Sequence, residues 1–210
     1  MVMRMWQQHG LFGGHAFLDF VNTVEDPGKS RMESALADWQ EVAAFAQAAG
    51  FATAAEAEAL AALDGEPDAA ARLDALLVFR ERAWEVLAAI AGGRGPEAGA
   101  AEAAGAAVPE DLADRIRGAY ARARLVPGEN GYRWEPGADG DPAAVLDDRL
   151  ALALDDLLAH RDLARLGECG RCTGLFLDHG RGVGRRWCRM KTCGNRAKAE
   201  AFRGRSSGGA

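Results

Sequence analysis

The sequence lacks any long apolar run, and no stretch of it approaches the roughly 20 consecutive apolar residues that span a bilayer. Its start, Met1 to Gly14, lacks the continuous apolar core and small-residue cleavage site of a signal peptide. Both absences predict a cytoplasmic protein without a membrane partner. Aromatic residues are scarce at 7%, but 49% of the residues are apolar and 27% are charged, which excludes disordered and fibrous classes.

Basic residues are sparse over most of the chain and concentrated near its end. The 210 residues hold 25 Lys and Arg and 31 Asp and Glu, for a net charge of -6. Residues 161–205 contain 12 basic and 4 acidic residues, a net +8, which leaves 13 basic and 27 acidic residues, a net -14, elsewhere. All four cysteines lie in this basic segment, which therefore carries the strongest functional signal. A length of 210 residues predicts one main domain and a small module.

The acidic part, residues 1–165, is rich in alanine, the best helix former, and predicts a mainly helical N-terminal domain. Apolar spacing and cap residues predict helices over residues 35–49, 53–63, 67–92, 109–117 and 141–167. Residues 119–135 predict a β-hairpin, with an irregular loop as the alternative. Residues 92–108 are expected to form a surface loop. Trp39 and Trp84 are expected in the core.

Residues 15–24 are compatible with a buried helix or a buried strand, and their periodicity does not decide between them. In a helix, Asp19, Asn22 and Thr23 share one face, with His15 one turn earlier. These four residues are a candidate pocket for a small-molecule effector; the alternative is that they satisfy backbone groups or cap an element. We find no nucleophile and base at interpretable spacing, so we predict no catalytic residue and no enzyme.

The four cysteines follow the spacing C-x2-C-x15-C-x4-C. This spacing predicts one structural zinc ion bound by Cys169, Cys172, Cys188 and Cys193. The alternatives are disulfides, a redox C-x-x-C pair or free buried thiols; a cytosolic location disfavours the first, and the lack of a thioredoxin-like βαβ pattern disfavours the second. Four thiolates close the coordination shell, so we expect a non-catalytic ion and no role for His179 as a ligand.

Residues 166–205 are expected to form a zinc-stapled hairpin followed by a helix, with a disordered tail over 206–210. The predicted strands are 175–178 and 185–188, with Phe176 and Trp187 as a miniature core, and the helix is predicted over 195–202. So short a module buries too little apolar surface to fold alone, so metal binding supplies its folding free energy. Chelation is therefore expected to unfold it.

The cysteine segment resembles the CGNR zinc-finger family over about residues 165–205. The resemblance lies in C-x2-C, then Phe-x-Asp, then Arg-Arg-Trp-Cys-x-Met-x-x-Cys-Gly-Asn-Arg at 185–196, with Lys198 following. Upstream, Leu-Asp-Phe-Val-Asn-Thr at 18–23 resembles the ABATE domain, which commonly precedes this finger. The resemblance implies a bacterial stress-induced transcription regulator, zinc ligation by the four cysteines, and DNA binding. Asp178 and His179, followed by glycines, depart from the more polar link expected there, which leaves the hairpin tip undefined.

Zinc with four thiolates carries about -2, so the segment keeps about +6 and can contact several phosphates. The candidate contacts to double-stranded DNA are Arg185, Arg186, Arg189, Lys191, Asn195, Arg196, Lys198 and Arg203. Asn195 and Arg196 are candidates for base readout, although Asn195 fits equally well as a brace for the turn around Cys193. The alternative for the whole patch is docking against the acidic body or a second copy of the chain.

Two functional hypotheses follow. The first is a two-part regulator, whose body senses an effector or forms a homodimer while the zinc-stapled tail binds DNA. The second is a zinc-stabilised assembly protein that binds no nucleic acid.

Overall fold

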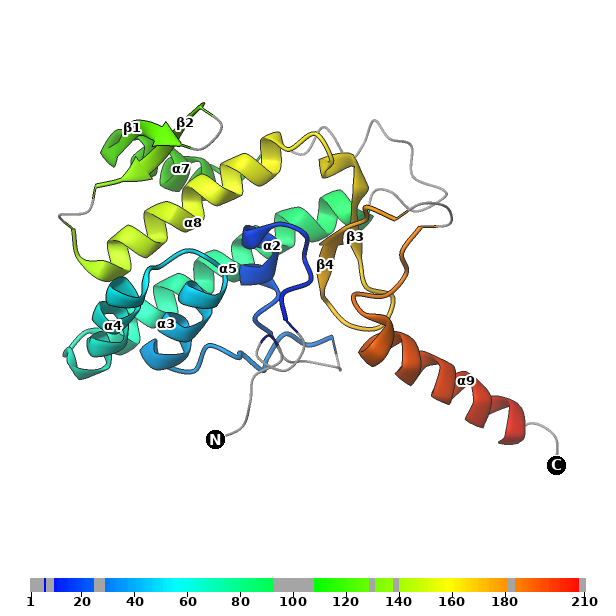
Figure 1. Cartoon of the computed structure of the whole chain (residues 1–210). Coiled ribbons are helices and arrows are strands. Elements are labelled where there is room, and N and C mark those ends of the chain that lie inside the picture. Colours follow the sequence, from blue (N-terminus) through cyan, green and yellow to red (C-terminus); the bar gives the residue numbers. More distant parts are fainter. Residues whose placement is uncertain are drawn as a thin grey trace.

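The computed structural model describes residue 6 and residues 10–24, 29–92, 108–128, 131–137, 140–180 and 184–207, with side chains through Arg203. It is mainly helical, as predicted, with two small antiparallel sheets (Figure 1). The α-helices are α2 Ala16–Val21, α3 Trp39–Ala48, α4 Ala54–Ala62, α5 Ala69–Gly92, α7 Glu110–Arg122, α8 Pro142–Ala159 and α9 Asn195–Ser207. The strands are β1 Ala123–Gly128, β2 Gly131–Pro136, β3 Leu166–Glu168 and β4 Leu175–Leu177. Short 3-10 helices cover Leu63–Gly65 and Leu163–Arg165, and a π-helical turn covers Met190–Gly194.

Side-chain caps fix the beginnings of α3, α4 and α8. The predicted capping box is present, because Thr53 accepts from the Glu56 amide while the Glu56 carboxylate accepts from the Thr53 amide at 2.8 Å. Asp141 caps α8 as predicted, accepting from the Ala144 amide. Asp38 accepts from the Glu41 amide, so α3 begins at Trp39 rather than at residue 35.

In the helical body, the predicted ends of α7 and α8 are wrong. Helix α7 continues to Arg122, because it buries Ala119 against the core and Arg122 pairs with Asp148 of α8 at 2.6 Å. The hairpin is confirmed, but it begins at residue 123 instead of 119. Helix α8 ends at Ala159 and not at Gly167, which lies in β3 opposite Phe176. Residues 93–107 of the expected surface loop lie outside the described residues.

The core is built around α2, which contacts α5, α8 and β4 (Figure 1). Residues 15–24, left open between helix and strand, thus contain a helix. Its Phe17 and Phe20 rings pack against Phe79 of α5 at centroid distances of 5.8 and 6.1 Å. Trp39 is fully buried, as expected, whereas Trp84 is only half-buried.

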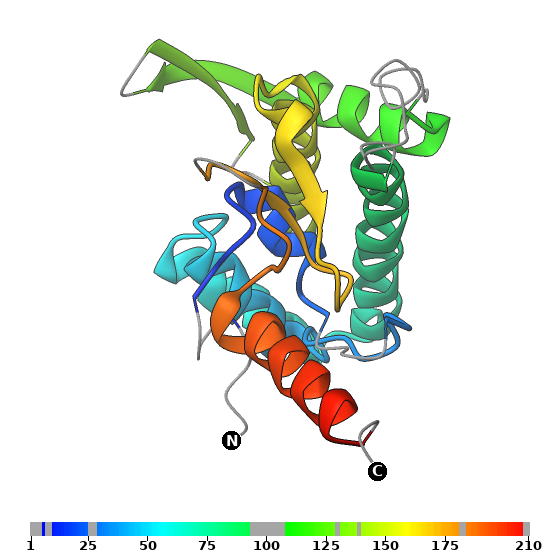
Figure 2. The same ribbon diagram turned by 90° about the vertical axis from the view of Figure 1, so that its right-hand side faces the viewer.

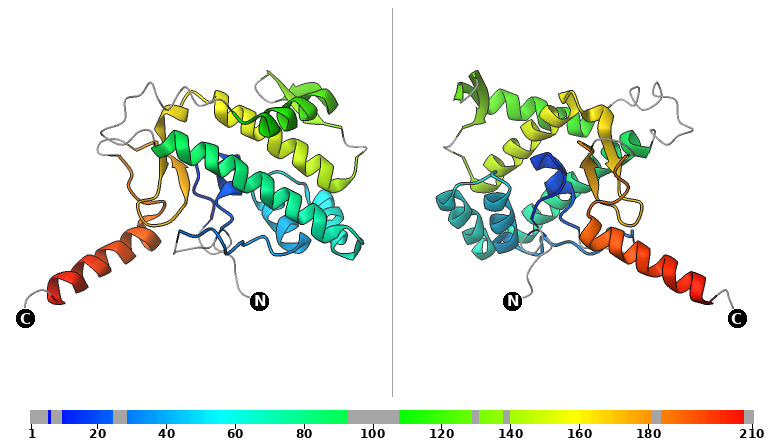
Figure 3. Two further views of the ribbon diagram at one scale, coloured as in Figure 1. Left: turned by 180° about the vertical axis from the view of Figure 1, so that it is seen from behind. Right: turned by 45° about the vertical axis from the view of Figure 1, so that its right-hand side comes forward.

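Strands β3 and β4 belong to the same core as the helices. Leu166, Leu175 and Leu177 are all buried in the cluster that contains α2, α5 and α8. Figure 2 shows this two-stranded hairpin lying beside α5, with α9 in front of it. Helix α9 projects away from the helical body, as both views in Figure 3 show. Among the described helices, none is long and apolar enough to cross a membrane.

Candidate metal centre and its attachment

Four sulfur atoms lie together at the start of the projecting helix. The Sγ atoms of Cys169, Cys172, Cys188 and Cys193 all lie within 4.8 Å of one another. The Cys172–Cys188 and Cys188–Cys193 sulfurs are 3.6 and 3.5 Å apart, too far for a disulfide. Zinc–sulfur bonds of about 2.3 Å in a tetrahedron place the sulfurs about 3.8 Å apart. The arrangement therefore fits one zinc ion, as the spacing predicted.

The clustered thiols do not share one protonation state, because hydrogen bonds among the sulfurs lower the pKa of Cys169 but raise that of Cys188. Hydrogen bonds with the other sulfurs, that of Cys169 first, and burial raise the pKa of the Cys188 thiol. A divalent ion reverses this effect and draws all four groups into the thiolate form. His179 lies outside the cluster, half exposed, with its Nδ1 3.7 Å from Asp162. We therefore assign the ion a structural role with four sulfur ligands.

The finger hairpin differs from the predicted one. Strand β4 matches the first predicted strand, but it pairs with β3, which precedes the first cysteine. The expected second strand at 185–188 is irregular. The turn of the hairpin is the segment 169–174, here called the zinc knuckle, which is closed by a bond from the Cys169 amide to the Gly174 carbonyl at 2.9 Å. Two ligands therefore sit on the hairpin turn itself, and the π-helical turn carries Cys193 to them.

A miniature core surrounds the sulfurs. Phe176 is fully buried against three of the cysteines, and Trp187 packs on the same cluster, as predicted. Phe12 also packs there, from the opposite end of the chain. No sequence pattern indicates this contact, because a lone aromatic in a segment without periodicity predicts no partner. The finger is thus completed by the N-terminal segment.

Two of the four residues expected to line an effector pocket, Asp19 and Asn22, instead help to attach the finger to the body. The Asn22 side chain donates to the Leu175 carbonyl and accepts from the Leu175 amide, both at 2.8 Å, and so replaces a neighbouring strand for β4. Asp19 accepts from the Phe12 and Gly13 amides, both at 2.8 Å, and burial raises its pKa. The alternative of backbone satisfaction therefore describes both side chains.

His15 and Thr23 have structural contacts as well. The His15 Nδ1 caps α2 by accepting from Phe17, and its Nε2 lies 2.9 Å from Asp156. The Thr23 hydroxyl donates to the Phe20 carbonyl at 2.7 Å. The cavity beside Asp19, Asn22 and Thr23 measures only about 10 Å³, room for one water at most.

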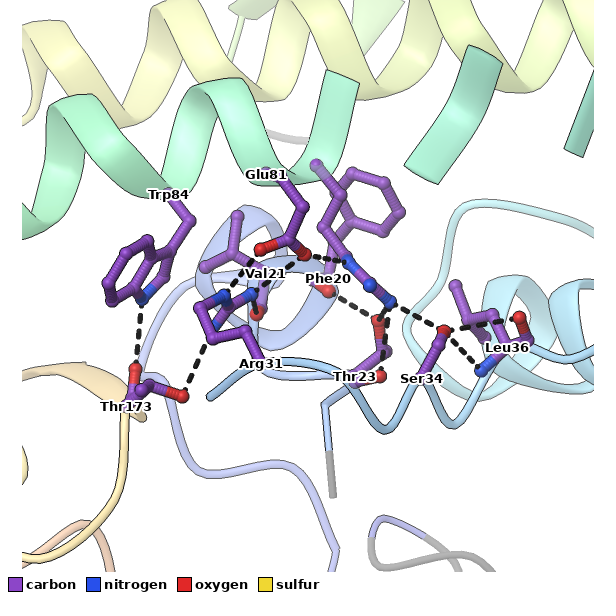
Figure 4. A network of polar contacts seen from close by, with 10 residues as sticks. Phe20, Val21, Thr23, Arg31, Ser34, Leu36, Glu81, Trp84 and Thr173 are labelled. Atoms are coloured by element: carbon purple, nitrogen blue, oxygen red, sulfur yellow. Dashed lines mark hydrogen bonds and ion pairs between the residues drawn. The ribbon is translucent and has the colours of Figure 1, made fainter. Parts of the chain in front are cut away.

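Sequence reasoning missed a buried polar network behind the knuckle (Figure 4). Arg80 on α5 is 2% exposed and donates to the Thr23 hydroxyl, the Ser34 hydroxyl and the Glu81 carboxylate at 3.1, 2.9 and 2.8 Å. Arg31 shares Glu81 with it, at 2.5 and 3.1 Å. The available signal was Arg80 itself, an arginine on the apolar stripe of the helix predicted over residues 67–92.

The predicted DNA-contact residues divide into two groups. Arg185 and Arg189 serve the fold: Arg185 donates to the carbonyls of Trp187 and Cys188, and Arg189 to that of Gly10. Their guanidinium groups lie 4.2 Å and 4.7 Å from the Phe176 and Phe12 ring centroids. Arg185 is nevertheless exposed, as is the second group, which comprises Arg186, Lys191, Asn195, Arg196, Lys198 and Arg203.

Helix α9 carries four of these exposed residues. It runs to Ser207, beyond the predicted end at residue 202, so residues 206 and 207 are helical and not a disordered tail; residues 208–210 lie outside the described residues. Glu200 on the helix pairs with Arg171 of the knuckle at 2.7 Å. This ion pair links the direction of α9 to the zinc centre.

A helical body bearing a four-thiolate module and an exposed basic helix is a zinc-finger protein. Residues 14–165 match the family ABATE, described as "Putative stress-induced transcription regulator", and residues 165–206 match the CGNR zinc finger. The chain belongs to the ABATE family and carries a C-terminal CGNR zinc finger, in the order expected from the sequence. No protein of curated function matches it. Both matching families are regulator or zinc-finger types, not enzymes.

Proposed function

We propose that this regulator binds double-stranded DNA in the cytoplasm through α9, with the helical body as its effector-sensing or dimerisation part. One observation carries the proposal: α9 leaves the zinc centre with every residue from Asn195 to Arg203 exposed, apart from the half-buried Ala197 (Figure 3). A helix that is buried on no side presents its side chains to a partner. Docking of the basic patch on the chain's own acidic body is not supported, because α9 points away from that body.

The dimensions of α9 suit the major groove. Its 13 residues make a helix about 20 Å long and about 10–12 Å across. The major groove of B-DNA, about 12 Å wide, admits a helix of this diameter. The zinc ion fixes the first turn through Cys193, which lies in the preceding π-helical turn. The helix therefore enters the groove in an orientation set by the metal centre.

The charge of this surface suits phosphates. Lys191, Arg196, Lys198 and Arg203 lie on α9 or the turn before it, and all are exposed. The one acidic residue among them, Glu200, is paired with Arg171. Four phosphate contacts correspond to a slope of about -3.6 in log K against log salt concentration.

We assign the contacts with the edges of the bases to Arg196. It lies in the first turn of α9, where residues of recognition helices commonly reach base edges. Asn195 beside it directs its amide to the Lys191 carbonyl at 3.4 Å, which braces the turn around Cys193. We therefore assign Asn195 the bracing role that the sequence left open.

Fluorescence anisotropy on duplex DNA at two salt concentrations tests the proposal with the zinc-loaded full chain. We expect micromolar or tighter binding at low salt that weakens steeply as salt rises. The variant R196A/K198A/R203A should bind at least about tenfold more weakly. Its matched control, R72A/R82A/R117A, removes the same charge from the body and should bind more tightly than the α9 variant at each salt concentration.

Absence of binding at low salt would exclude DNA as the partner. Equal losses in both triple variants would show that binding depends on net charge alone, which would contradict the role of α9.

A homodimer through the β1–β2 hairpin is the second candidate. Leu125, Tyr132 and Trp134 lie on one face of this hairpin with 54, 74 and 46% of their surface exposed. Apolar side chains gathered in this way are typical of contact surfaces. Sedimentation of the protein without DNA decides: a dimer that L125S/W134S converts to a monomer supports this face, and a concentration-independent monomer excludes it.

An effector would bind between the α3–α4 turn, β2 and α8. A cleft of about 410 Å³ lies there, lined by Phe51, Arg133, Trp134 and Arg149 among others. Arg149 is held in place by the Phe51 carbonyl and the Glu56 carboxylate at 2.6 and 2.5 Å. Arg133 and Trp134 are exposed, so an anionic or aromatic ligand suits this cleft better than residues 15–23.

A further inference from the structure

Within the described part of the chain, hydrogen bonds from the helical body reach the zinc knuckle at Thr173, which directly follows the ligand Cys172. Thr173 is 5% exposed although it lies in a turn. Its hydroxyl accepts from Arg31 at 3.1 Å, and its carbonyl accepts from the Trp84 indole at 3.0 Å (Figure 4). Two residues outside the finger therefore fix both oxygens of the residue beside a metal ligand.

Arg31 is itself fixed on all sides. Its side chain is 7% exposed and binds both oxygens of Glu81. It also donates to the Val21 carbonyl at 2.9 Å, and its guanidinium lies 4.4 Å from the centre of the Trp84 ring. Its backbone φ of 55° lies in the left-handed region, which a non-glycine residue keeps only where its surroundings impose it.

The position of Thr173 determines the position of the nearest sulfur. The amide nitrogen of Gly174, which follows Thr173, lies 3.4 Å from the Cys172 Sγ. The amide of the next residue, Leu175, donates a hydrogen bond to the Asn22 side chain. Cys172 is the most exposed of the four ligands, since the other three are buried. It therefore depends most on its neighbours for its orientation.

We propose that Arg31 and Trp84 are positioning residues for the zinc centre. They hold the knuckle with the Cys172 sulfur directed at the other three ligands, so that the helical body sets the zinc affinity of the finger. Groups that orient metal ligands from behind commonly change metal affinity 10- to 100-fold when they are lost. The inference does not depend on whether the protein binds DNA.

Thr173 offers a matched pair of variants for the test. T173V keeps the shape of the side chain but removes the hydroxyl that Arg31 reaches, whereas T173S keeps the hydroxyl. Zinc affinity is measured by competition with a chromogenic chelator, at a temperature well below unfolding. We expect T173V to lose about tenfold in zinc affinity and T173S to stay within about twofold of wild type. W84F, which keeps a ring without the N–H donor, should also lose about tenfold.

General destabilisation is controlled by L60A, which removes a buried side chain of α4 away from the knuckle. L60A should lower the free energy of unfolding but leave the zinc affinity of the folded protein unchanged. The proposal fails if T173V binds zinc as wild type does, or if L60A and T173V lose zinc affinity equally.

Discussion

At the scale of single residues, the side chain of Asn22 takes the place of a neighbouring strand beside β4. Its amide makes both bonds that a neighbouring backbone would make to Leu175, across 153 positions of sequence. An Asn side-chain amide holds its C=O acceptor and N–H donors in one plane, like the C=O and N–H of a peptide group. It can therefore complete the free edge of a very short sheet. The Asn of the signature at residues 18–23 therefore has a structural explanation.

Replacing Asn22 by Ala should lower the free energy of unfolding by about 2–3 kcal/mol, because the Leu175 amide and carbonyl would be left without partners near the core. Urea denaturation measures the loss. The control is Q40A, which removes another side-chain amide that reaches a carbonyl, that of Ala61 at 3.1 Å, but on the exposed surface. Similar losses in N22A and Q40A would contradict the role assigned to Asn22.

The sequence was sufficient to predict the metal ligands but not the hydrogen-bond partners of the buried arginines. Four cysteines at fixed spacing determine a metal site by local chemistry alone, so the site could be predicted. Arg31 and Arg80 could not be placed, because their partners Thr173, Thr23 and Ser34 lie far along the chain. An isolated arginine carries no periodic signal that would reveal such partners.

At the scale of elements, the beginning of α2 is packed too tightly against the preceding segment for any side chain but glycine at residue 13. A Cβ on Gly13 would lie 2.6 Å from the Leu18 Cβ and 3.1 Å from the Asp19 backbone nitrogen. The Gly13 carbonyl accepts from the Leu177 amide of β4 at 2.8 Å. The segment before α2 thus forms part of the finger edge.

Gly13→Ala should destabilise the protein by about 2 kcal/mol or more, since such a contact forces apart packed backbone. Thermal unfolding checks this expectation. Gly65→Ala is the control, because nothing lies within 4 Å of a Cβ there, and it should be neutral or slightly stabilising. If G13A unfolded at the same midpoint temperature as the wild type, the segment before α2 would have moved to make room for the Cβ, which would contradict the tight packing at residue 13.

At this scale, the longer elements could be predicted from the sequence and the shortest could not. Helices α4 and α8 have side-chain caps, and α5 has several turns of apolar spacing, so their positions were largely foreseeable. Strand β3 has three residues with Gly167 in the middle, a composition that disfavours a strand. It is a strand only because β4 pairs with it, which is a tertiary fact that no local pattern records.

At the scale of the whole molecule, the finger and body share one core. Leu166, Leu175 and Leu177 are buried in the same cluster as Phe17 and Phe79. Chelation was expected to unfold the finger alone. The shared leucines instead indicate that loss of the metal weakens the entire protein.

Zinc removal should therefore lower the unfolding midpoint of the full chain by about 10 °C or more, since several kcal/mol are lost from a protein of this size. Far-ultraviolet circular dichroism should report the helices, and near-ultraviolet circular dichroism the packing of the ordered aromatic side chains, Trp187 of the finger among them. We expect the two signals to change together with and without zinc. A separate, earlier transition of the finger would contradict the shared core, and added zinc should restore the original midpoint.

The hydrogen bonds between residues 10–24 and strand β4 also have a consequence for the synthesis of the protein. A ribosome makes residues 10–24 well before β4, and 153 positions separate Asn22 from its partner Leu175. While those positions are being added, residues 10–24 of the nascent chain must remain without their native partners in β4. Native assembly can be completed only after the last cysteine has emerged from the exit tunnel.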